Sequence, residues 1–489
     1  MSNTRAELVF VPAPGMGHIP STVELAKLIL RRNDDISVSI HIIDLPNHSS
    51  KIKSYVDFQS RDSPFPTRLT FVTYPPLYDP SDPCSSLDSI FSLIRLHRPH
   101  VKQAVEGRIR AGLARPVGFV VDMFCTGMQD IANDLHVPTY VFYTSGAGSL
   151  MFILYAQWLV DHDGVDIATE FSDPGFSAVV PGFNNRVPSK VIPPGFKDKN
   201  FMCEVLLNLG RNLRKMKGIL VNSYIELESS VIHAFLECNG QKIPRIYPVG
   251  PTLVLDDKSR GGSDDMEKKT VVEWLDGQPK SSVVFLCFGS GGSFDEEQVK
   301  EIANGLDRSG YRFLWALRLF LQKEKPRASN DKEAFLEALP EGFIDRTAHK
   351  GKIIGWAPQV EVLAHPAVGG FVSHCGWNST LESLWFGVPM ATWPMGAEQQ
   401  LNAFQLVNEL EISTEIRMDY NVDWGAGKGN FVVTAEEVED GVKKLMGMDK
   451  KIKENVKKMS EEGRKALEEG GSSYCSLGDF IGDVISNVL

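Results

Sequence analysis

Short apolar segments that alternate with longer stretches of helical periodicity constrain the fold of this chain more than any other feature. Four such segments in the first third of the sequence are rich in β-branched and aromatic residues and cover residues 8–11, 37–43, 117–121 and 139–143. Runs of this kind are typical of strands that are buried on both faces of a parallel sheet and joined by helices. The stretch 21–32, which follows Pro20, carries apolar residues on one helical face and predicts the first of these helices.

The same pattern begins again in the second half of the chain. Helical stretches there separate further strand candidates at 283–288, 311–317, 352–355, 370–373 and 390–393. Between the halves, the polar stretch 256–265 predicts an exposed linker, and 323–331 predicts a surface loop. We therefore expect an α/β chain of two doubly wound domains that divide near residue 250, with two or three helices from Thr434 onward.

The net charge and the cysteine content limit the binding partners and the cellular compartment that we expect for this chain. The chain has 51 Lys and Arg residues against 62 Asp and Glu, a net charge of −11, which argues against nucleic-acid binding and against docking on an anionic membrane. Its 7 cysteines are scattered without metal-ligand spacing, so we expect neither a zinc site nor a disulfide framework, and a cytoplasmic location. The longest apolar segment, 150–160, is too short to span a membrane, and no signal peptide is expected.

Two strand ends in the first half carry polar residues. The loop after the first strand contains Gly15, Gly17 and His18, and Asp122 ends an otherwise apolar strand. A buried carboxylate is costly unless it is paired, so Asp122 needs a partner, and an imidazole would serve. A His18–Asp122 pair could deprotonate an alcohol. The alternatives are a partly exposed histidine in a tight turn and an aspartate that caps the next helix.

The densest set of polar groups follows a strand end in the second half. That strand ends in His374, a glycine turn follows, and a helix that begins near Asn378 stops at Gly387. The positive end of the helix dipole and its backbone N–H groups form an anion site, to which His374, Asn378 and Ser379 can add donors for a diphosphate. The structural alternative is a capping box formed by Ser379 and Glu382, which needs no ligand.

A dinucleotide site is a competing hypothesis for the first loop. Gly15 and Gly17 begin a G-x-G-x-x-G fingerprint, and Asp44 ends the next strand, where an acid that binds ribose would lie. Pro20 stands where the third glycine of the fingerprint is needed. The match is therefore incomplete.

A hydrolase and a metal-dependent transferase are weaker hypotheses. Serines such as Ser145 follow strands, and Cys375 adjoins a histidine, but the chain contains no G-x-S-x-G elbow. Asp161 and Asp163 spell a D-x-D sequence, which we interpret as an exposed turn after an apolar helix. No metal site is expected.

A longer motif in the second half resembles a known family. The run from Trp356-Ala-Pro-Gln359 through Phe371-Val-Ser-His374-Cys-Gly-Trp377-Asn-Ser379 to Glu398-Gln399 resembles the signature box of plant UDP-dependent glycosyltransferases that act on small lipophilic molecules. The resemblance extends over the whole chain and includes His18 and Asp122. It implies the GT-B architecture, two Rossmann-like domains facing across a cleft. The acceptor-binding domain would cover residues 1–250 and the UDP-sugar-binding domain 251–459, with a C-terminal helix, about 460–489, packed back on the first domain.

The resemblance also implies roles for individual residues. Those expected to bind UDP are Ser293, Trp356, Ala357, Gln359, His374, Trp377, Asn378, Ser379 and Glu382. Those expected at the sugar are Thr144, Trp393, Glu398 and Gln399. From position and composition, we expect the acceptor to be lined by Met123, Phe124, Phe142, Phe196, Phe201 and Met202.

The reaction implied by the resemblance is an inverting transfer of glucose from UDP-glucose to a hydroxyl group. His18 would be the general base, assisted by Asp122, and the acceptor a flavonoid or other phenolic, a terpenoid or a hormone. The helix N-terminus would stabilise the departing UDP, so neither a metal nor a cofactor is implied. A monomer is expected. The alternatives are an NAD-dependent oxidoreductase and a non-catalytic protein that binds nucleotide sugars.

Overall fold

The computed structural model describes residues 5–45, 49–75, 77, 87–237, 242–255, 265–320, 337–423 and 427–487. Contacts divide the chain into two compact units. The first unit comprises Met1–Trp158, Val205–Gly262 and Lys465–Leu489, and the second comprises Leu159–Glu204 and Ser263–Arg464. The predicted surface loop 323–331 and all of the predicted linker except Asp265 lie outside the described residues.

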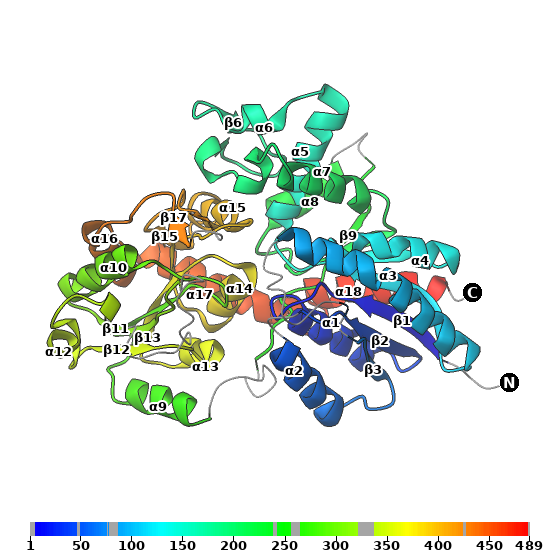
Figure 1. Cartoon of the computed structure of the whole chain (residues 1–489), viewed down its shortest axis with the longest axis horizontal. Helices are drawn as coiled ribbons and strands as arrows, with labels where there is room; N and C mark the ends of the chain where they lie inside the picture. The colour runs from blue at the N-terminus through cyan, green and yellow to red at the C-terminus, as the bar shows by residue number, and fades with distance from the viewer. Residues whose placement is uncertain are drawn as a thin grey trace. The chain divides into compact units, whose positions relative to one another are not determined.

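A parallel sheet forms the centre of the first unit (Figure 1). Within the described residues it has seven strands in the order β3-β2-β1-β4-β5-β8-β9, and every neighbouring pair is parallel. The strands are β1 (Ala6–Val11), β2 (Ile36–Ile42), β3 (Leu69–Thr73), β4 (Arg115–Asp122), β5 (Thr139–Tyr143), β8 (Gly218–Val221) and β9 (Arg245–Pro248). The four segments predicted as strands are confirmed as β1, β2, β4 and β5. Side chains along β1 from Leu8 to Val11 are fully buried, as expected for a strand covered on both faces.

Helices connect these strands. Those with all or most of their residues in the first unit are α1 (Ile19–Arg32), α2 (Ser49–Asp62), α3 (Leu87–Arg110), α4 (Gln129–Asp134), α5 (Ala147–Asp163), α7 (Met202–Leu213), α8 (Ser229–Glu237) and α18 (Ser472–Ser486). Helix α1 begins with Pro20 in its first turn, as predicted. The C-terminal helix α18 belongs to this unit, where the guanidinium of Arg32 lies 3.6 Å from the ring centroid of Tyr474 and Arg245 contacts Asp479 at 2.6 Å.

The segment Leu159–Glu204 lies early in the sequence but belongs by its contacts to the second unit. Its elements are short: α6 (Ile167–Glu170), β6 (Ser177–Ala178), β7 (Val187–Pro188), η3 (Ser189–Val191) and η4 (Pro194–Lys197). The ring of Phe183 stacks on that of Phe404, with centroids 6.5 Å apart. The backbone N–H groups of Asn184 and Asn185 donate to the carboxylate of Glu409 at 2.7 and 2.9 Å. These contacts differ from the prediction that residues 1–250 form one N-terminal domain.

A second parallel sheet forms the centre of the second unit. Its described strands number six, in the order β12-β11-β10-β13-β14-β15, and all neighbouring pairs are parallel. They are β10 (Val283–Cys287), β11 (Arg312–Ala316), β12 (Gly351–Ile354), β13 (Val368–Ser373), β14 (Met390–Thr392) and β15 (Ser413–Glu415). These strands confirm all five strand candidates of the second half.

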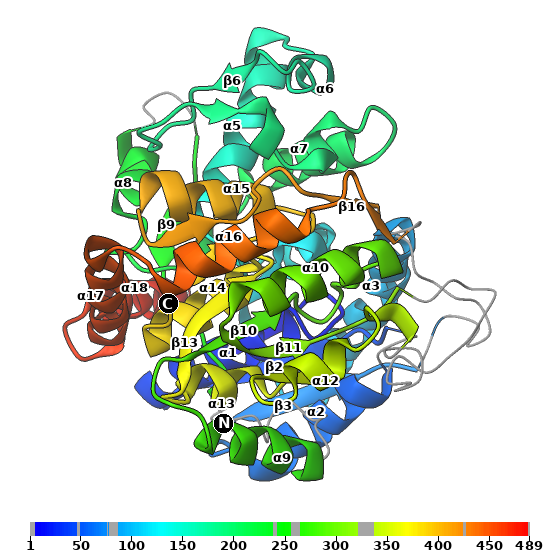
Figure 2. The ribbon, with the colours of Figure 1, turned by 90° about the vertical axis from the view of Figure 1, so that its left-hand side faces the viewer.

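The helices of the second unit cover this sheet. They are α9 (Asp265–Asp276), α10 (Glu296–Ser309), α12 (Phe343–Thr347), α13 (Gln359–Ala364), α14 (Trp377–Phe386), α15 (Gln399–Phe404), α16 (Ala435–Met446) and α17 (Lys450–Leu467), which runs on into the first unit. A one-turn π-helix, η6 (Gln405–Glu409), follows α15, and a small antiparallel pair consists of β16 (Val422–Asp423) and β17 (Lys428–Gly429). Helices α10 and α16 lie side by side (Figure 2). A Cβ atom at Gly305 would lie 2.6 Å from that of Val438, so glycine permits this close approach.

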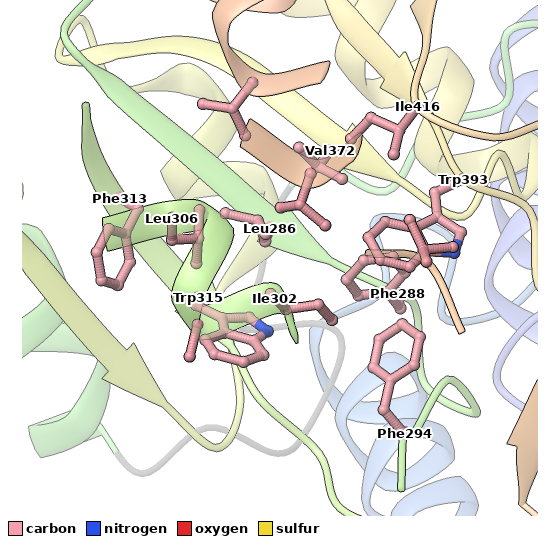
Figure 3. Packing of buried hydrophobic residues seen from close by; sticks show 14 of the residues in the cluster. Leu286, Phe288, Phe294, Ile302, Leu306, Phe313, Trp315, Val372, Trp393 and Ile416 are labelled. Carbon is pink, nitrogen blue, oxygen red and sulfur yellow. The ribbon is translucent and has the colours of Figure 1, made fainter. Parts of the chain in front are cut away.

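Apolar side chains from the second sheet and from α10 form a continuous core (Figure 3). Leu286 on β10, Trp315 on β11 and Val372 on β13 are fully buried, as are Ile302 and Leu306 on α10. Burying one such aliphatic side chain contributes about 1.5–3 kcal/mol. This core fixes the carboxyl ends of β10 and β13, where the predicted diphosphate ligands begin.

Across the described ranges, no helix has both the length and the apolar character that crossing a bilayer requires.

Candidate active site

The ends of β1 and β4 bring His18 and Asp122 together in the first unit. The two strands are neighbours, with Val11 paired to Val121 in register, so the loop after β1 begins beside the last residue of β4. Gly15 has a φ of +122°, a conformation that favours glycine, and its carbonyl accepts from the backbone N–H of His18. His18 Nδ1 lies 2.8 Å from Asp122 Oδ2, with the side chains 24% and 0% exposed. A solvent-accessible imidazole thus lies on a buried carboxylate.

Both carboxylate oxygens of Asp122 have a defined partner. Oδ1 accepts the backbone N–H of Phe124 at 2.9 Å and so caps the short helix η2 (Met123–Met128), while Oδ2 faces His18. The two alternatives raised by the sequence, helix cap and imidazole partner, are therefore both present. When Nδ1–H donates to a carboxylate, Nε2 is the nitrogen that can take up a proton. The geometry suits a general base.

Thr144 lies at the same imidazole. It follows the last residue of β5, and its Oγ1 is 3.0 Å from His18 Nδ1. The resemblance placed Thr144 at the sugar, whereas the structure gives its hydroxyl a contact with the ring of His18. The buried carboxylate of Glu228, which the sequence analysis did not single out, accepts the N–H groups of Ala147 and Gly148 at 2.7 Å each and caps α5 just after Thr144.

Aromatic rings extend from His18 into the first unit. Phe124 meets the imidazole edge-on at 5.6 Å between centroids, and Phe91 meets Phe124 in the same way at 5.6 Å. Met123 directly follows Asp122, and Phe142 pairs with Asp122 in register, with residue exposures of 9% and 1%. Phe91 was missed because α3 begins beside a polar, proline-rich stretch that gives no strand-end signal.

The other predicted acceptor residues belong to the second unit. Phe196 is 3% exposed and packs against Phe171 at 6.4 Å, whereas Phe201 is 38% exposed. Met202, partly buried, is the first residue of α7. These three side chains are not part of the group around His18 within the first unit.

In the second unit, Gln359, Ser379 and Glu382 meet directly. Gln359 Nε2 donates to Ser379 Oγ at 2.9 Å and to Glu382 Oε2 at 2.7 Å. Helix α14 begins at Trp377 with Gly376 as its N-cap, so Ser379 lies inside the helix and the capping-box alternative is wrong. These two hydrogen bonds fix the side chains of Gln359, Ser379 and Glu382 relative to one another and link the start of α13 to α14. The predicted uracil residues Trp356 and Ala357 lie in the loop before α13, partly buried and buried.

His374 occupies a narrow space at the end of β13. Cys287 pairs with Ser373 in register, which places the loop after β10 next to His374. A Cβ atom at either Gly289 or Gly376 would lie 2.5 Å from His374 Nε2, so both glycines make room for the ring. Burial lowers the pKa of His374 to about 4, so the imidazole is neutral at pH 7. It can offer one N–H donor to an anion.

The remaining diphosphate and sugar candidates lie on neighbouring loops and helix ends. Ser293 follows β10, and Asn378 is on the first turn of α14, both partly buried. Glu398 is the N-cap residue of α15. Gln399 Oε1 accepts the N–H groups of Met395 at 2.8 Å and Gly396 at 3.1 Å, which fixes its amide. Trp377 is almost fully buried.

Trp393 occupies a different environment from the one expected of a sugar ligand. Its ring is fully buried and packs against Phe288 at 5.5 Å and Phe294 at 5.6 Å (Figure 3). It also packs against Tyr420 at 5.7 Å. The indole belongs to the core, because the backbone turns its side chain inward at the end of β14. The buried position of this side chain contradicts its expected place at the sugar.

The structure also describes the residues on which the hydrolase, dinucleotide and metal-dependent hypotheses depend. Burial raises the pKa of Cys375 to about 12, so its thiol stays protonated and cannot act as a nucleophile at neutral pH. Asp44 accepts from Ser49 Oγ at 2.7 Å and from the N–H of Leu45 at 2.9 Å. The D-x-D sequence at 161–163 lies in the last turn of α5, not in a turn after it. Among the described residues, no group of three or more His, Cys, Asp or Glu side chains could hold a metal ion.

Known proteins resemble this chain over nearly its whole length. Residues 263–464 match the family model of UDP-glucoronosyl and UDP-glucosyl transferase. The chain is 48% identical to UDP-glycosyltransferase 71E1 of Stevia rebaudiana, with 99% of each chain covered. It is 46% identical to UDP-glucose flavonoid 3-O-glucosyltransferase 6 of Fragaria ananassa, with 98% of each chain covered.

A solved structure extends the likeness to the fold. The crystal structure of Medicago truncatula UGT71G1 complexed with UDP-glucose matches with a TM-score of 0.84 at 38% identity, and 99% of each chain is covered. The likeness extends over nearly the whole of both chains and, with the relatives above, confirms the family resemblance. The chain therefore has the GT-B fold and belongs to the plant UDP-dependent glycosyltransferases.

Proposed function

We propose that this enzyme transfers glucose from UDP-glucose to a hydroxyl of a small lipophilic acceptor, with inversion at the anomeric carbon. The observation that carries the proposal is the 2.8 Å contact between His18 Nδ1 and the buried Asp122 Oδ2. The relative in Fragaria ananassa is named for UDP-glucose and a flavonoid, and the Medicago truncatula structure contains UDP-glucose. These names support glucose as the sugar and a flavonoid as one acceptor. Another phenolic, a terpenoid or a hormone stays part of the proposed range of acceptors.

His18 would act as the general base. The acceptor hydroxyl donates to Nε2 and loses its proton to that nitrogen as its oxygen attacks the anomeric carbon from the face opposite UDP. A bond forms between the acceptor oxygen and the anomeric carbon, while the bond from that carbon to the phosphate oxygen breaks. The Asp122 carboxylate balances the charge of the imidazolium that forms.

The second unit would bind the donor. We assign the uracil to Trp356 and Ala357, the ribose to Gln359 and Glu382, and the sugar to Glu398 and Gln399. The residues assigned to the diphosphate are Ser293, His374, Asn378 and Ser379, and Trp377 is assigned to UDP as a whole. The N-terminus of α14 would stabilise the negative charge that grows on the departing UDP. A divalent ion is not needed for that role in the proposed mechanism.

The first unit would bind the acceptor beside His18. The edge-on rings of Phe124 and Phe91 supply an apolar surface next to the base, which supports an aromatic or other apolar acceptor. Met123 and Phe142 are assigned to the same region, while a role of Phe196, Phe201 and Met202 at the acceptor stays a prediction from the sequence. The monomeric state and the cytoplasmic location stay predictions from the sequence.

The direct test is an assay with UDP-glucose and a panel of phenols, terpenoids and hormones, with the products detected by mass. We expect the mass of one hexose to be added to at least one acceptor, and the product to be the β-glucoside, because inversion changes the α-linked glucose of the donor. A chelator should leave the rate unchanged. UDP binding without product on any acceptor would contradict the proposal, as would an α-glucoside.

The diphosphate assignment predicts a large loss of UDP affinity in Gly289→Ala. The new methyl group would meet His374 Nε2 at 2.5 Å, and the φ of +73° at this position is strained for any other residue. Displacement of His374 should weaken UDP binding about tenfold in a calorimetric titration. The control is Gly277→Ala in the same unit, where the nearest atom, Trp274 O, is at an ordinary 3.5 Å. Equal UDP affinity in both variants would remove His374 from the diphosphate site.

A further inference from the structure

The hydroxyl of Thr144 has a contact that a role at the sugar does not explain. Its Oγ1 lies 3.0 Å from His18 Nδ1, the same ring nitrogen that lies 2.8 Å from Asp122 Oδ2. Thr144 and Asp122 are 6% and 2% exposed, so water does not compete freely for either oxygen. Two oxygen atoms therefore face one nitrogen, which carries at most one hydrogen.

The charges decide how that hydrogen is used. The carboxylate of Asp122 can only accept, so Nδ1 must carry the hydrogen and donate it. Thr144 Oγ1 then presents a lone pair to the same N–H, because a hydroxyl hydrogen directed at Nδ1 would collide with the hydrogen already there. The result is a three-centre hydrogen bond with one charged and one neutral acceptor.

A single acceptor at Nδ1 restrains the orientation of the imidazole less than two acceptors do. A second acceptor on a different strand end fixes the plane of the ring, and with it the direction of the lone pair on Nε2. We propose that Thr144 is a positioning residue for the base, which orients His18 and stabilises its imidazolium form through Nδ1–H. This inference rests on the proposed function of His18.

The surroundings of Thr144 suit a positioning role. Strand β5 pairs with β4 up to Phe142 opposite Asp122, so Thr144 leaves the sheet at the same edge as the carboxylate. Beyond it, the carboxylate of Glu228 caps α5 at 2.7 Å from two N–H groups, and Tyr143 Oη lies 3.0 Å from Ser149 Oγ. The segment after β5 that carries Thr144 is therefore fixed by hydrogen bonds of the residues on either side of it. The ring of Phe124, at 5.6 Å, contacts the imidazole as a further neighbour.

Thr144→Val tests the inference, because it removes the hydroxyl and nearly preserves the shape of the side chain. We expect kcat for glucosyl transfer to fall about 5- to 10-fold, the loss of one hydrogen bond to a group that becomes charged. The KM for UDP-glucose should stay within about twofold of the unmodified enzyme. Thr144→Ser, which retains the oxygen, should recover at least about half of kcat. A hydroxyl that acts at the sugar would instead raise the KM for UDP-glucose.

The matched control is Thr139→Val on the same strand. Thr139 is also buried, and its Oγ1 has no hydrogen-bond partner among the residues that the structure describes, so its loss should leave kcat and KM unchanged. A Thr144→Val enzyme with full kcat overturns the inference, as does a rise in KM alone or a serine variant as slow as the valine variant. In each of those cases the unmodified enzyme still makes glucoside, and His18→Ala has lost most of that rate. Failure of the proposed function is distinct, since the unmodified enzyme then makes no glucoside, or His18→Ala remains active.

Discussion

Replacement of His18 by alanine is expected to lower kcat for glucosyl transfer by about 10³-fold while UDP affinity changes less than about twofold. The imidazole is the group that takes the proton from the acceptor, and its Nδ1 contacts lie within the first unit, at Asp122 and Thr144. The residues assigned to UDP lie in the second unit, so the substitution leaves them intact. The measurements are steady-state rates with the best acceptor of the panel and a calorimetric titration with UDP.

A histidine outside the site provides the control for this substitution. His349 is exposed in the second unit, so His349→Ala should retain the full rate. If His18→Ala were as fast as His349→Ala, His18 could not be the base. If His18→Ala lost UDP binding as well as rate, the assignment of UDP binding to residues of the second unit alone would be wrong.

Asp122→Asn is expected to lower kcat by about 10²- to 10⁴-fold with little change in fold. The amide oxygen of asparagine can keep the hydrogen bond from the N–H of Phe124. Its NH₂ group would then face His18 Nδ1 and donate to it, which places the ring hydrogen on Nε2. A histidine with Nε2–H cannot accept a proton from the acceptor, and no carboxylate remains to stabilise the imidazolium. The rate and the thermal midpoint of unfolding should be measured together.

The control for Asp122→Asn is an aspartate with the same capping role and no imidazole. Asp166 is exposed, caps α6 and accepts from the N–H of Thr169 at 3.2 Å. Asp166→Asn should therefore keep the full rate. An Asp122→Asn enzyme that works at a comparable rate would show that the carboxylate neither selects the tautomer nor stabilises the imidazolium.

Much of the fold could be predicted because its signals are local. Apolar runs located β1, β2, β4, β5 and, in the second sheet, β10 to β14 to within about two residues, as expected for strands buried on both faces, but they did not indicate β15. The helix after His374 ended at Gly387, which has a φ of 69°. The three helices α16, α17 and α18 follow Thr434, in agreement with the prediction of two or three.

Contacts between distant segments could not be predicted in the same way. Nothing in the spacing of 159–204 shows that Phe183 stacks on Phe404, which lies more than two hundred residues later. The same limit applies to Glu228, which caps a helix that begins at Ala147. Periodicity reports which face of an element is buried, but it does not report the partner that covers that face.

The candidate site illustrates the same difference at the level of single residues. The sequence located the strand ends that carry His18, Asp122 and His374, because polar residues after apolar strands are conspicuous. It could not distinguish a tryptophan in the core from one at a ligand, since Trp393 also follows a strand. Nor could it place the Thr144 hydroxyl, whose contact depends on the register between β4 and β5.

The grouping of Leu159–Glu204 with the second unit bears on how chimeras of related enzymes should be built. A single crossover near residue 250 would give this segment a parent different from that of Phe404 and Glu409. Both the ring stack and the carboxylate that receives two backbone N–H groups would then depend on whether the parents happen to match. Crossovers placed beside residues 158 and 204, as well as in the linker, would give each hybrid this segment and the residues that it contacts from the same parent enzyme.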